Sequence, residues 1–208
     1  MNLVDRLLCE LDTGLRTVFA VAHADRPLPG RAENPAKLDA TARDESIRLM
    51  RVNHTGEVCA QALYQGQAMV SRSASTRELL VHAAREEHDH LAWCQSRLND
   101  LDGHTSRLNP LFYGGSFAFG VASGLLGDKW SLGFLVETER QVEAHLNDHL
   151  SKIPVGDDAS RRILDAMRED EIRHGQTGLD HGGAPLPAPI RAVMHAFSTV
   201  MTRTTYWV

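Results

Sequence analysis

The sequence contains two Glu-x-x-His motifs, and each follows a further glutamate at nearly the same distance. That distance is 30 residues in the first half of the chain and 32 in the second. Residues three apart on a helix share a face, so each motif can offer an oxygen and a nitrogen to one ion. The six residues of this pattern are Glu57, Glu87, His90, Glu139, Glu171 and His174.

The spacing places the four glutamates at one height of a helical bundle. Turn residues lie near Ser71 to Ser75 in the first half and near Pro154 to Asp157 in the second. At a rise of 1.5 Å per residue, both glutamates of the first half lie about 18–21 Å from their turn. In the second half, Glu139 and Glu171 likewise lie at similar distances from their turn. The halves therefore resemble a repeated helix hairpin, the arrangement that carboxylate-bridged di-metal bundles use.

Apolar stripes surround these polar residues. Leu80 and Leu91 share a helix face with Glu87, and Leu135 shares one with Glu139. An unpaired buried charge is very costly, and a pair of divalent metal ions would compensate four buried carboxylates. Carboxylates with imidazoles suit iron or manganese better than zinc or copper. The sequence thus predicts a metal site with these six ligands, and it indicates no catalytic residue beyond them.

Turn signals divide the 208 residues into helical parts, and no run of alternating β-branched residues indicates a strand. The fold class is therefore all-α, a single ferritin-like four-helix bundle with extra helices at both ends. Its predicted parts are an N-terminal helix and linker (1–42, with a loop at Asn34–Pro35), a first hairpin (43–101), an apolar insert (108–127), a second hairpin (128–178) and a C-terminal amphipathic helix (190–208).

Two helix starts carry capping signals. Ser75 and Glu78 have capping-box spacing, which predicts a helix from residue 75. Asp157 or Asp158 is expected to cap the last helix of the second hairpin.

The insert contains twenty residues without a charge and five glycines. It is long enough for a membrane span, but the glycines, and the need for both hairpins on one side, argue against one. A buried helix is one interpretation; a segment that lies in a membrane interface or lines an apolar channel is the other. The C-terminal helix, with Phe197 and Trp207 beside Arg203, resembles an interfacial helix, although packing on the bundle would give the same pattern.

Composition excludes several classes of protein. A net charge of −5 gives no excess of basic residues of the kind that nucleic-acid-binding proteins have. The three cysteines form no CxxC pair, so a zinc ribbon, a rubredoxin-type site and a rubrerythrin are disfavoured. Widely spaced cysteines indicate a reduced, cytoplasmic setting, and the charged N-terminus is not typical of a signal peptide.

Most other polar residues near the motifs are expected to serve no ligand role. We predict that His145 and His149 lie at the surface, and that Glu86 and Asp89 face solvent. Glu143, one turn after Glu139, remains an alternative ligand.

Four segments resemble the demethoxyubiquinone hydroxylase family, and the similarity extends from about Arg43 to the C-terminus. The string Arg51-Val-Asn-His-Thr-Gly-Glu57 and the apolar insert are its more specific features, because many ferritin-like proteins share the six ligands. The other segments are Glu87-His-Asp-His90, Val136-Glu-Thr-Glu139 and Glu171-Ile-Arg-His174.

The resemblance implies a di-iron monooxygenase, peripheral on the cytoplasmic face of the cell membrane, that hydroxylates the ring of a polyprenyl methoxy-methyl-benzoquinol with O2 in ubiquinone biosynthesis. The same six residues would bind two iron ions. Other ubiquinone-biosynthesis proteins and a homo-oligomer remain open as partners. A ferritin-like iron-oxidising or storage protein is the alternative, although it would not need the insert, and a helical scaffold would leave the buried carboxylates unexplained.

Overall fold

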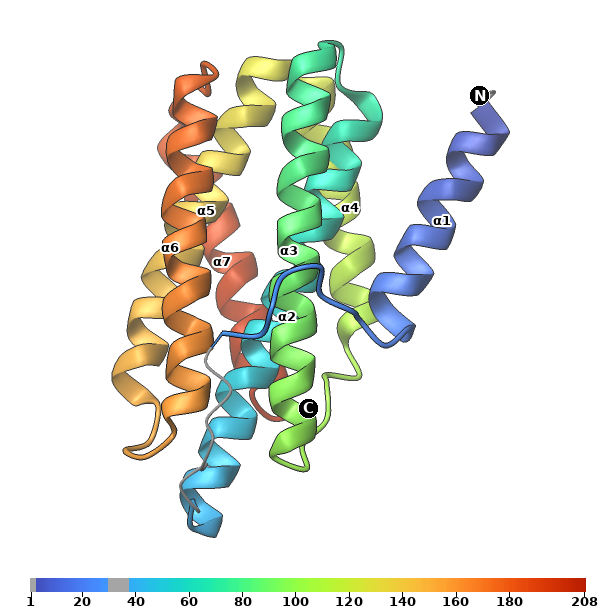
Figure 1. Ribbon diagram of the computed structural model, residues 1–208. Helices are drawn as coiled ribbons and strands as arrows, with labels where there is room; N and C mark the ends of the chain where they lie inside the picture. The colour runs from blue at the N-terminus through green and yellow to red at the C-terminus, as the bar shows by residue number, and fades with distance from the viewer. Residues whose placement is uncertain (1–2, 30–37) are drawn as a thin grey trace.

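The computed structural model describes residues 3–29 and 38–208, which form helices and no strand (Figure 1). The predicted loop at Asn34–Pro35 lies outside these residues. The all-α prediction is confirmed, and the helices differ from the predicted spans by a few residues. They are α1 (Leu3–Phe19), α2 (Ala40–Val70), α3 (Ala74–Asp100), α4 (Asn109–Leu125), α5 (Asp128–Lys152), α6 (Asp158–Asp180) and α7 (Ala188–Thr205).

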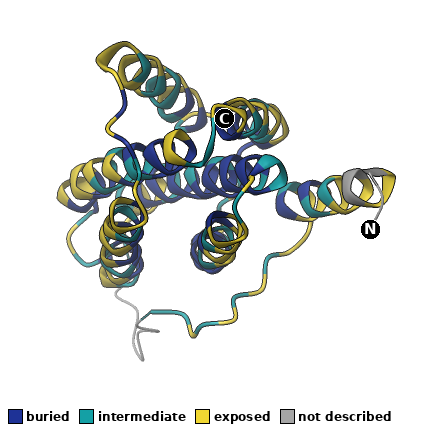
Figure 2. Cartoon of the chain, turned by 90° about the horizontal axis from the view of Figure 1, so that it is seen from above, coloured by how far each residue is buried: buried dark blue, intermediate teal, exposed yellow. Residues whose placement is uncertain are grey.

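Four long helices, α2, α3, α5 and α6, form the ferritin-like bundle. α2 packs on α3 and α5 on α6, and the two hairpins meet through α3 against α6 and α2 against α5. Seen from above, their buried sides face one another (Figure 2). The fully buried Met50, Leu98, Leu146 and Met167 come one from each helix and belong to one apolar cluster. The bundle therefore has a continuous core that both hairpins share.

The caps confirm one prediction and correct the other. Asp157 is the N-cap of α6 and accepts a hydrogen bond from the Ser160 amide. For α3 the predicted cap at Ser75 is wrong, because the N-cap lies two residues earlier. Ser73 is the N-cap and accepts from the Thr76 amide, while the Ser75 hydroxyl only contacts that of Ser73. A serine two residues upstream offered the same capping chemistry with an additional half-turn of helix.

The apolar insert forms α4, which lies along α2. Two glycines explain how close the helices come: a Cβ at Gly120 would collide with the Leu63 carbonyl oxygen, and one at Gly66 with the Phe117 carbonyl oxygen. The glycines of the insert therefore serve helix packing. Within the described residues, no helix is both long and apolar enough to cross a membrane.

The terminal helices pack on the outside of the bundle. α7 contacts α2 and α5. α1 lies beside α4 (Figure 1), and most of its described side chains are exposed. A Cβ at Gly14 would lie 2.8 Å from the Tyr113 ring, so the ring would have to shift. After α1 the chain crosses α3 at mid-height as an irregular segment (Figure 1).

Candidate metal centre

The six residues of the sequence pattern come together inside the bundle. Their ligand atoms form two groups, and within each group all atoms lie within 4.8 Å of one another. Glu87 and Glu171, the two motif glutamates, belong to both groups. Two neighbouring metal positions with two shared, bridging carboxylates would match this arrangement. The groups are Glu57, Glu87, His90 and Glu171, and Glu87, Glu139, Glu171 and His174.

Both histidines turn the same ring nitrogen toward the carboxylates. His90 Nδ1 lies 3.0 Å from Glu87 and 3.3 Å from Glu171. His174 Nδ1 lies 3.3 Å and 3.5 Å from the same two glutamates. The helical i, i+3 spacing and the antiparallel packing of α3 on α6 produce this near-symmetry.

The other ring nitrogen of each histidine contacts a carboxylate on the opposite hairpin. His90 Nε2 lies 2.9 Å from Asp170, and His174 Nε2 lies 2.8 Å from Glu86. Such outer carboxylates fix the tautomer and orientation of ligand histidines, because they accept the Nε2 proton and leave the Nδ1 lone pair for the metal.

The prediction that Glu86 and Asp89 face solvent is therefore wrong. The Glu86 side chain is 19% exposed and binds His174, and Asp89 is buried. Helical geometry placed both off the stripe, but the neighbouring elements cover that side as well. Asp170 was missed altogether. A signal was present, since an acidic residue directly precedes the glutamate in both motifs, as Glu86-Glu87 and Asp170-Glu171.

Electrostatics in the cluster reflect crowding of buried carboxylates. Burial, together with neighbouring carboxylates, raises the pKa values of Glu57 and Glu139 well above the usual range. Burial also acts to raise the pKa of Glu87, but the nearby His174 and His90 rings outweigh burial and hold that pKa low. Burial would lower the pKa of His90, yet contacts with Asp170 and the ligand glutamates raise it.

The donor set fits a pair of divalent cations. Five buried atoms of these six residues make no hydrogen bond: Glu87 Oε1, Glu139 Oε2, both carboxylate oxygens of Glu171, and His174 Nδ1. Buried polar atoms normally have partners, so their convergence in one place indicates a ligand. Oxygen-rich sites with two imidazoles suit iron or manganese. Glu143 belongs to neither group of potential ligands within the described part of the chain.

Tyr64 adds a buried hydroxyl to one side of the cluster. It is fully buried on α2 and donates a 2.5 Å hydrogen bond to Glu139 Oε1. Burial and the adjacent carboxylates raise its pKa well above the usual value, so the phenol keeps its proton. The contact fixes one oxygen of Glu139 and leaves the other without a partner.

The string Arg51 to Glu57 connects the cluster to its surroundings. Arg51 donates to the carbonyl oxygens of His104 and Tyr206, which ties α2 to the α3–α4 connection and the C-terminus. Thr55 donates to the side chain of Asn109 at the start of α4. The segment therefore holds α4 and the C-terminal end around the site.

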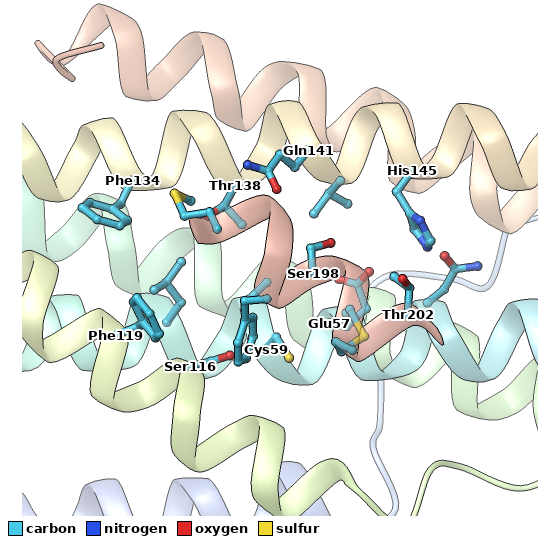
Figure 3. A pocket seen from close by; sticks show the side chains of 18 residues that line it. Glu57, Cys59, Ser116, Phe119, Phe134, Thr138, Gln141, His145, Ser198 and Thr202 are labelled. Atoms are coloured by element: carbon cyan, nitrogen blue, oxygen red, sulfur yellow. The ribbon is translucent and has the colours of Figure 1, made fainter. Parts of the chain in front are cut away.

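An apolar pocket of about 120 Å³ reaches the cluster at Glu57. Helices α2, α4, α5 and α7 contribute its walls. Figure 3 shows Phe119 and Phe134 at one end, His145 at the other, and Ser198 from α7 between them. The insert packs on α2 and lines part of this apolar pocket, while other residues of the insert are exposed. A position in a membrane interface stays a prediction. α7 packs on the bundle as the pocket's cover.

The predicted surface position of His145 and His149 is wrong. His149 is buried, and its Nδ1 lies 3.1 Å from the side-chain oxygen of Asn53 on α2. His145 lines the pocket, its Nε2 is buried without a partner, and the two rings lie 3.8 Å apart. Burial lowers the pKa values of His145 to about 4 and of His149 to about 2, so both rings are neutral. The end of α5 packs on α2, which the sequence of α5 alone does not indicate.

Comparisons with known proteins place the chain in a family. The family model of "Ubiquinone biosynthesis protein COQ7" matches residues 44–205. Proteins named 3-demethoxyubiquinol 3-hydroxylase from Polynucleobacter necessarius and Nitrosospira multiformis are 56% and 54% identical to the chain, over 99% of each chain. A protein of the same name from Burkholderia pseudomallei is 54% identical over 98% of both chains. The chain therefore belongs to the COQ7 family of ubiquinone biosynthesis proteins.

Proposed function

We propose that the protein is a di-iron monooxygenase that hydroxylates the ring of a 2-polyprenyl-3-methyl-6-methoxy-1,4-benzoquinol in ubiquinone biosynthesis. The enzyme class and the substrate follow from relatives that share more than half of its residues over nearly their full length and are named for this reaction. The observation in the structure that carries the proposal is an apolar pocket ending at a cluster of buried carboxylates and histidines.

The reaction inserts one oxygen atom of O2 into a ring C–H bond, while two electrons and two protons reduce the other atom to water. Bound iron would supply the redox chemistry that activates O2. Glu57, Glu87, His90, Glu139, Glu171 and His174 would hold the two ions, and Glu87 and Glu171 belong to both groups of potential ligands.

The pocket supports the choice of an oily ring substrate. The Phe119 and Phe134 end is apolar and suits the prenyl chain, while Thr138, Gln141 and Ser198 offer hydroxyl and amide groups to ring oxygens. Glu57 is a ligand candidate and a pocket wall at once, so a ring in the pocket lies directly beside the metal centre. Apolar walls also exclude bulk water from the reacting atoms.

We also propose that the enzyme works as a peripheral protein on the cytoplasmic face of the cell membrane. Helices α4 and α7, which close the pocket, carry exposed Leu111, Leu125 and Val200, and the exposed Trp207 follows α7. Vesicle co-sedimentation tests this part. Leu125→Ser should weaken binding, and Ile172→Ser, an equally exposed apolar residue on α6, is the matched control. Equal losses in both variants would contradict docking through α4.

The central experiment is anaerobic reconstitution with Fe(II), followed by metal analysis and a quinol hydroxylation assay by mass spectrometry. We expect about two irons per chain, lost in a Glu171→Ala, His174→Ala variant, and a product heavier by one oxygen atom that carries label from ¹⁸O₂. Iron uptake far beyond two per chain without hydroxylation would favour an iron-storage protein instead. No iron binding would refute the metal centre.

A further inference from the structure

The irregular segment between α1 and the bundle, residues 20–29, reaches the metal centre from outside. We call it the strap; it crosses α3 toward α6 (Figure 1). The strap lies before residue 44, where the match to the family model begins. The alignments with bacterial relatives nevertheless cover 99% of this chain.

Arg26 of the strap bridges two buried carboxylates from different hairpins. Its Nε donates to Asp89 on α3 and its Nη1 to Asp170 on α6, each over 2.7 Å. Asp89 and Asp170 are 6% and 9% exposed at the side chain, against 34% for Arg26. The planar guanidinium suits this task, because its donors form a rigid fork that a lysine does not have.

The oxygen that Arg26 binds on Asp170 is the one that faces His90. Asp170 Oδ2 lies 2.7 Å from Arg26 Nη1 and 2.9 Å from His90 Nε2. Arg173 binds the other oxygen, Oδ1, over 2.7 Å. Asp170 is therefore held from both sides, and Arg26 alone fixes the atom that orients the histidine.

Arg26 also packs over the ring of Trp93, which lies beside His90. Its guanidinium carbon lies 4.7 Å from the centre of the Trp93 ring, and Trp93 lies 5.3 Å from the His90 ring. Two independent routes, one through hydrogen bonds and one through packing, thus connect a residue of the strap to the same ligand.

Backbone contacts dock the strap in this position. The Asp25 amide donates to Asp89 Oδ1 and the Ala22 amide donates to Gln95 Oε1, both over 2.7 Å. Asp89 thus receives the backbone and the side chain of the strap together. Asp89 therefore holds the strap in place, while Asp170 connects Arg26 to His90.

The geometry points to Arg26 as a positioning residue of the metal centre, with the strap as a clamp that holds Asp170 and Trp93 against His90. This inference rests on the proposed metal site. Loss of an outer partner of a ligand histidine typically weakens metal binding about 10–100-fold. Arg26 acts one contact further out, so we expect the lower end of that range.

The test uses Co(II), which reports its coordination by visible absorption, and the full-length protein. Wild type, Arg26→Gln, Arg26→Lys and the control Arg16→Gln are loaded with Co(II), and metal release to a chelator is timed. Arg16 lies on α1, just before the strap, in an exposed ion pair with Asp12. Its loss therefore removes a nearby positive charge without changing any contact of the strap. Circular dichroism confirms that each variant keeps its helices.

We expect about tenfold faster release from Arg26→Gln, with a changed Co(II) spectrum and an unchanged Arg16→Gln. Arg26→Lys should also release metal faster than wild type, because lysine lacks the rigid fork whose two nitrogens bind Asp89 and Asp170 separately. Release from both Arg26 variants at the wild-type rate would overturn the role of the strap while leaving the metal centre intact. A wild-type protein that binds no metal would overturn the metal centre and the inference together.

Discussion

Gly56 offers a direct test of the pocket, because it lies beside Glu57 on the pocket wall. A Cβ built on Gly56 meets no atom within 4 Å, so the first atom of a larger side chain has room there. Gly56→Leu should therefore place an isobutyl group at the wall of the space in which the quinol ring would lie.

The expected effects on folding and on catalysis have opposite signs. Glycine inside a helix is about 1 kcal/mol less favourable than alanine, and leucine is close to alanine, so unfolding by urea should show a gain of up to about 1 kcal/mol. Displacing the ring by an ångström or more should lower kcat/KM for the quinol about 100-fold, or about 2.7 kcal/mol of transition-state stabilisation. Iron content should not change.

Gly114 provides the matched control. It lies in α4, is exposed, and a Cβ there also meets nothing within 4 Å. Gly114→Leu should show the same gain in helix stability with normal turnover. Hydroxylation by Gly56→Leu at the wild-type rate, with iron bound, would refute the assignment of the pocket to the ring.

Three further predictions concern charge. His54 is buried, and burial lowers its pKa to about 4. In the unfolded chain the same side chain binds a proton below about pH 6.5. The free energy of unfolding should therefore fall by about 1.4 kcal/mol per pH unit as the pH falls from 6.5 toward 4. In His54→Gln, the free energy of unfolding, measured with urea at several pH values, should depend less on pH. An unchanged pH dependence would contradict the lowered pKa of His54. Arg97→Met leaves the buried Asp157 carboxylate without its 2.7 Å ion pair and should cost about 3–5 kcal/mol in the same assay. Because Glu57 and Glu139 have raised pKa values, metal binding at neutral pH should release protons, measurable with an indicator dye in weak buffer.

The sequence predicted that these six residues come together, because its signals are local to single helices. A Glu-x-x-His motif identifies its own helix face, and the distance of Glu57 and Glu87 from one turn predicts that they meet. These inferences need only the rise of a helix and the direction of a hairpin. The structure brings the six residues together at the height that the arithmetic gives.

The errors concern contacts between elements that the helical periodicity does not describe. Glu86 looked solvent-facing on its own helix, yet α6 brings His174 to it. His149 lies at the end of α5, where exposure is usual, but Asn53 of α2 packs there. Arg26 comes from a segment without any periodic pattern, so nothing in the sequence placed it against α3 and α6. Such contacts depend on how helices pack, and helix packing follows from the whole set of side chains.

The reciprocal contacts of the two histidines have a consequence for how the proposed pair of ions would bind. The inner ligands are nearly symmetric between the hairpins, but their supports differ. The His90 side is supported by Asp170 with two arginines on it, whereas the His174 side is supported by the partly exposed Glu86. Two chemically similar positions held with unequal stiffness should fill in sequence, with the stiffer one first. A half-loaded form would then be a discrete species, with one ion beside His90.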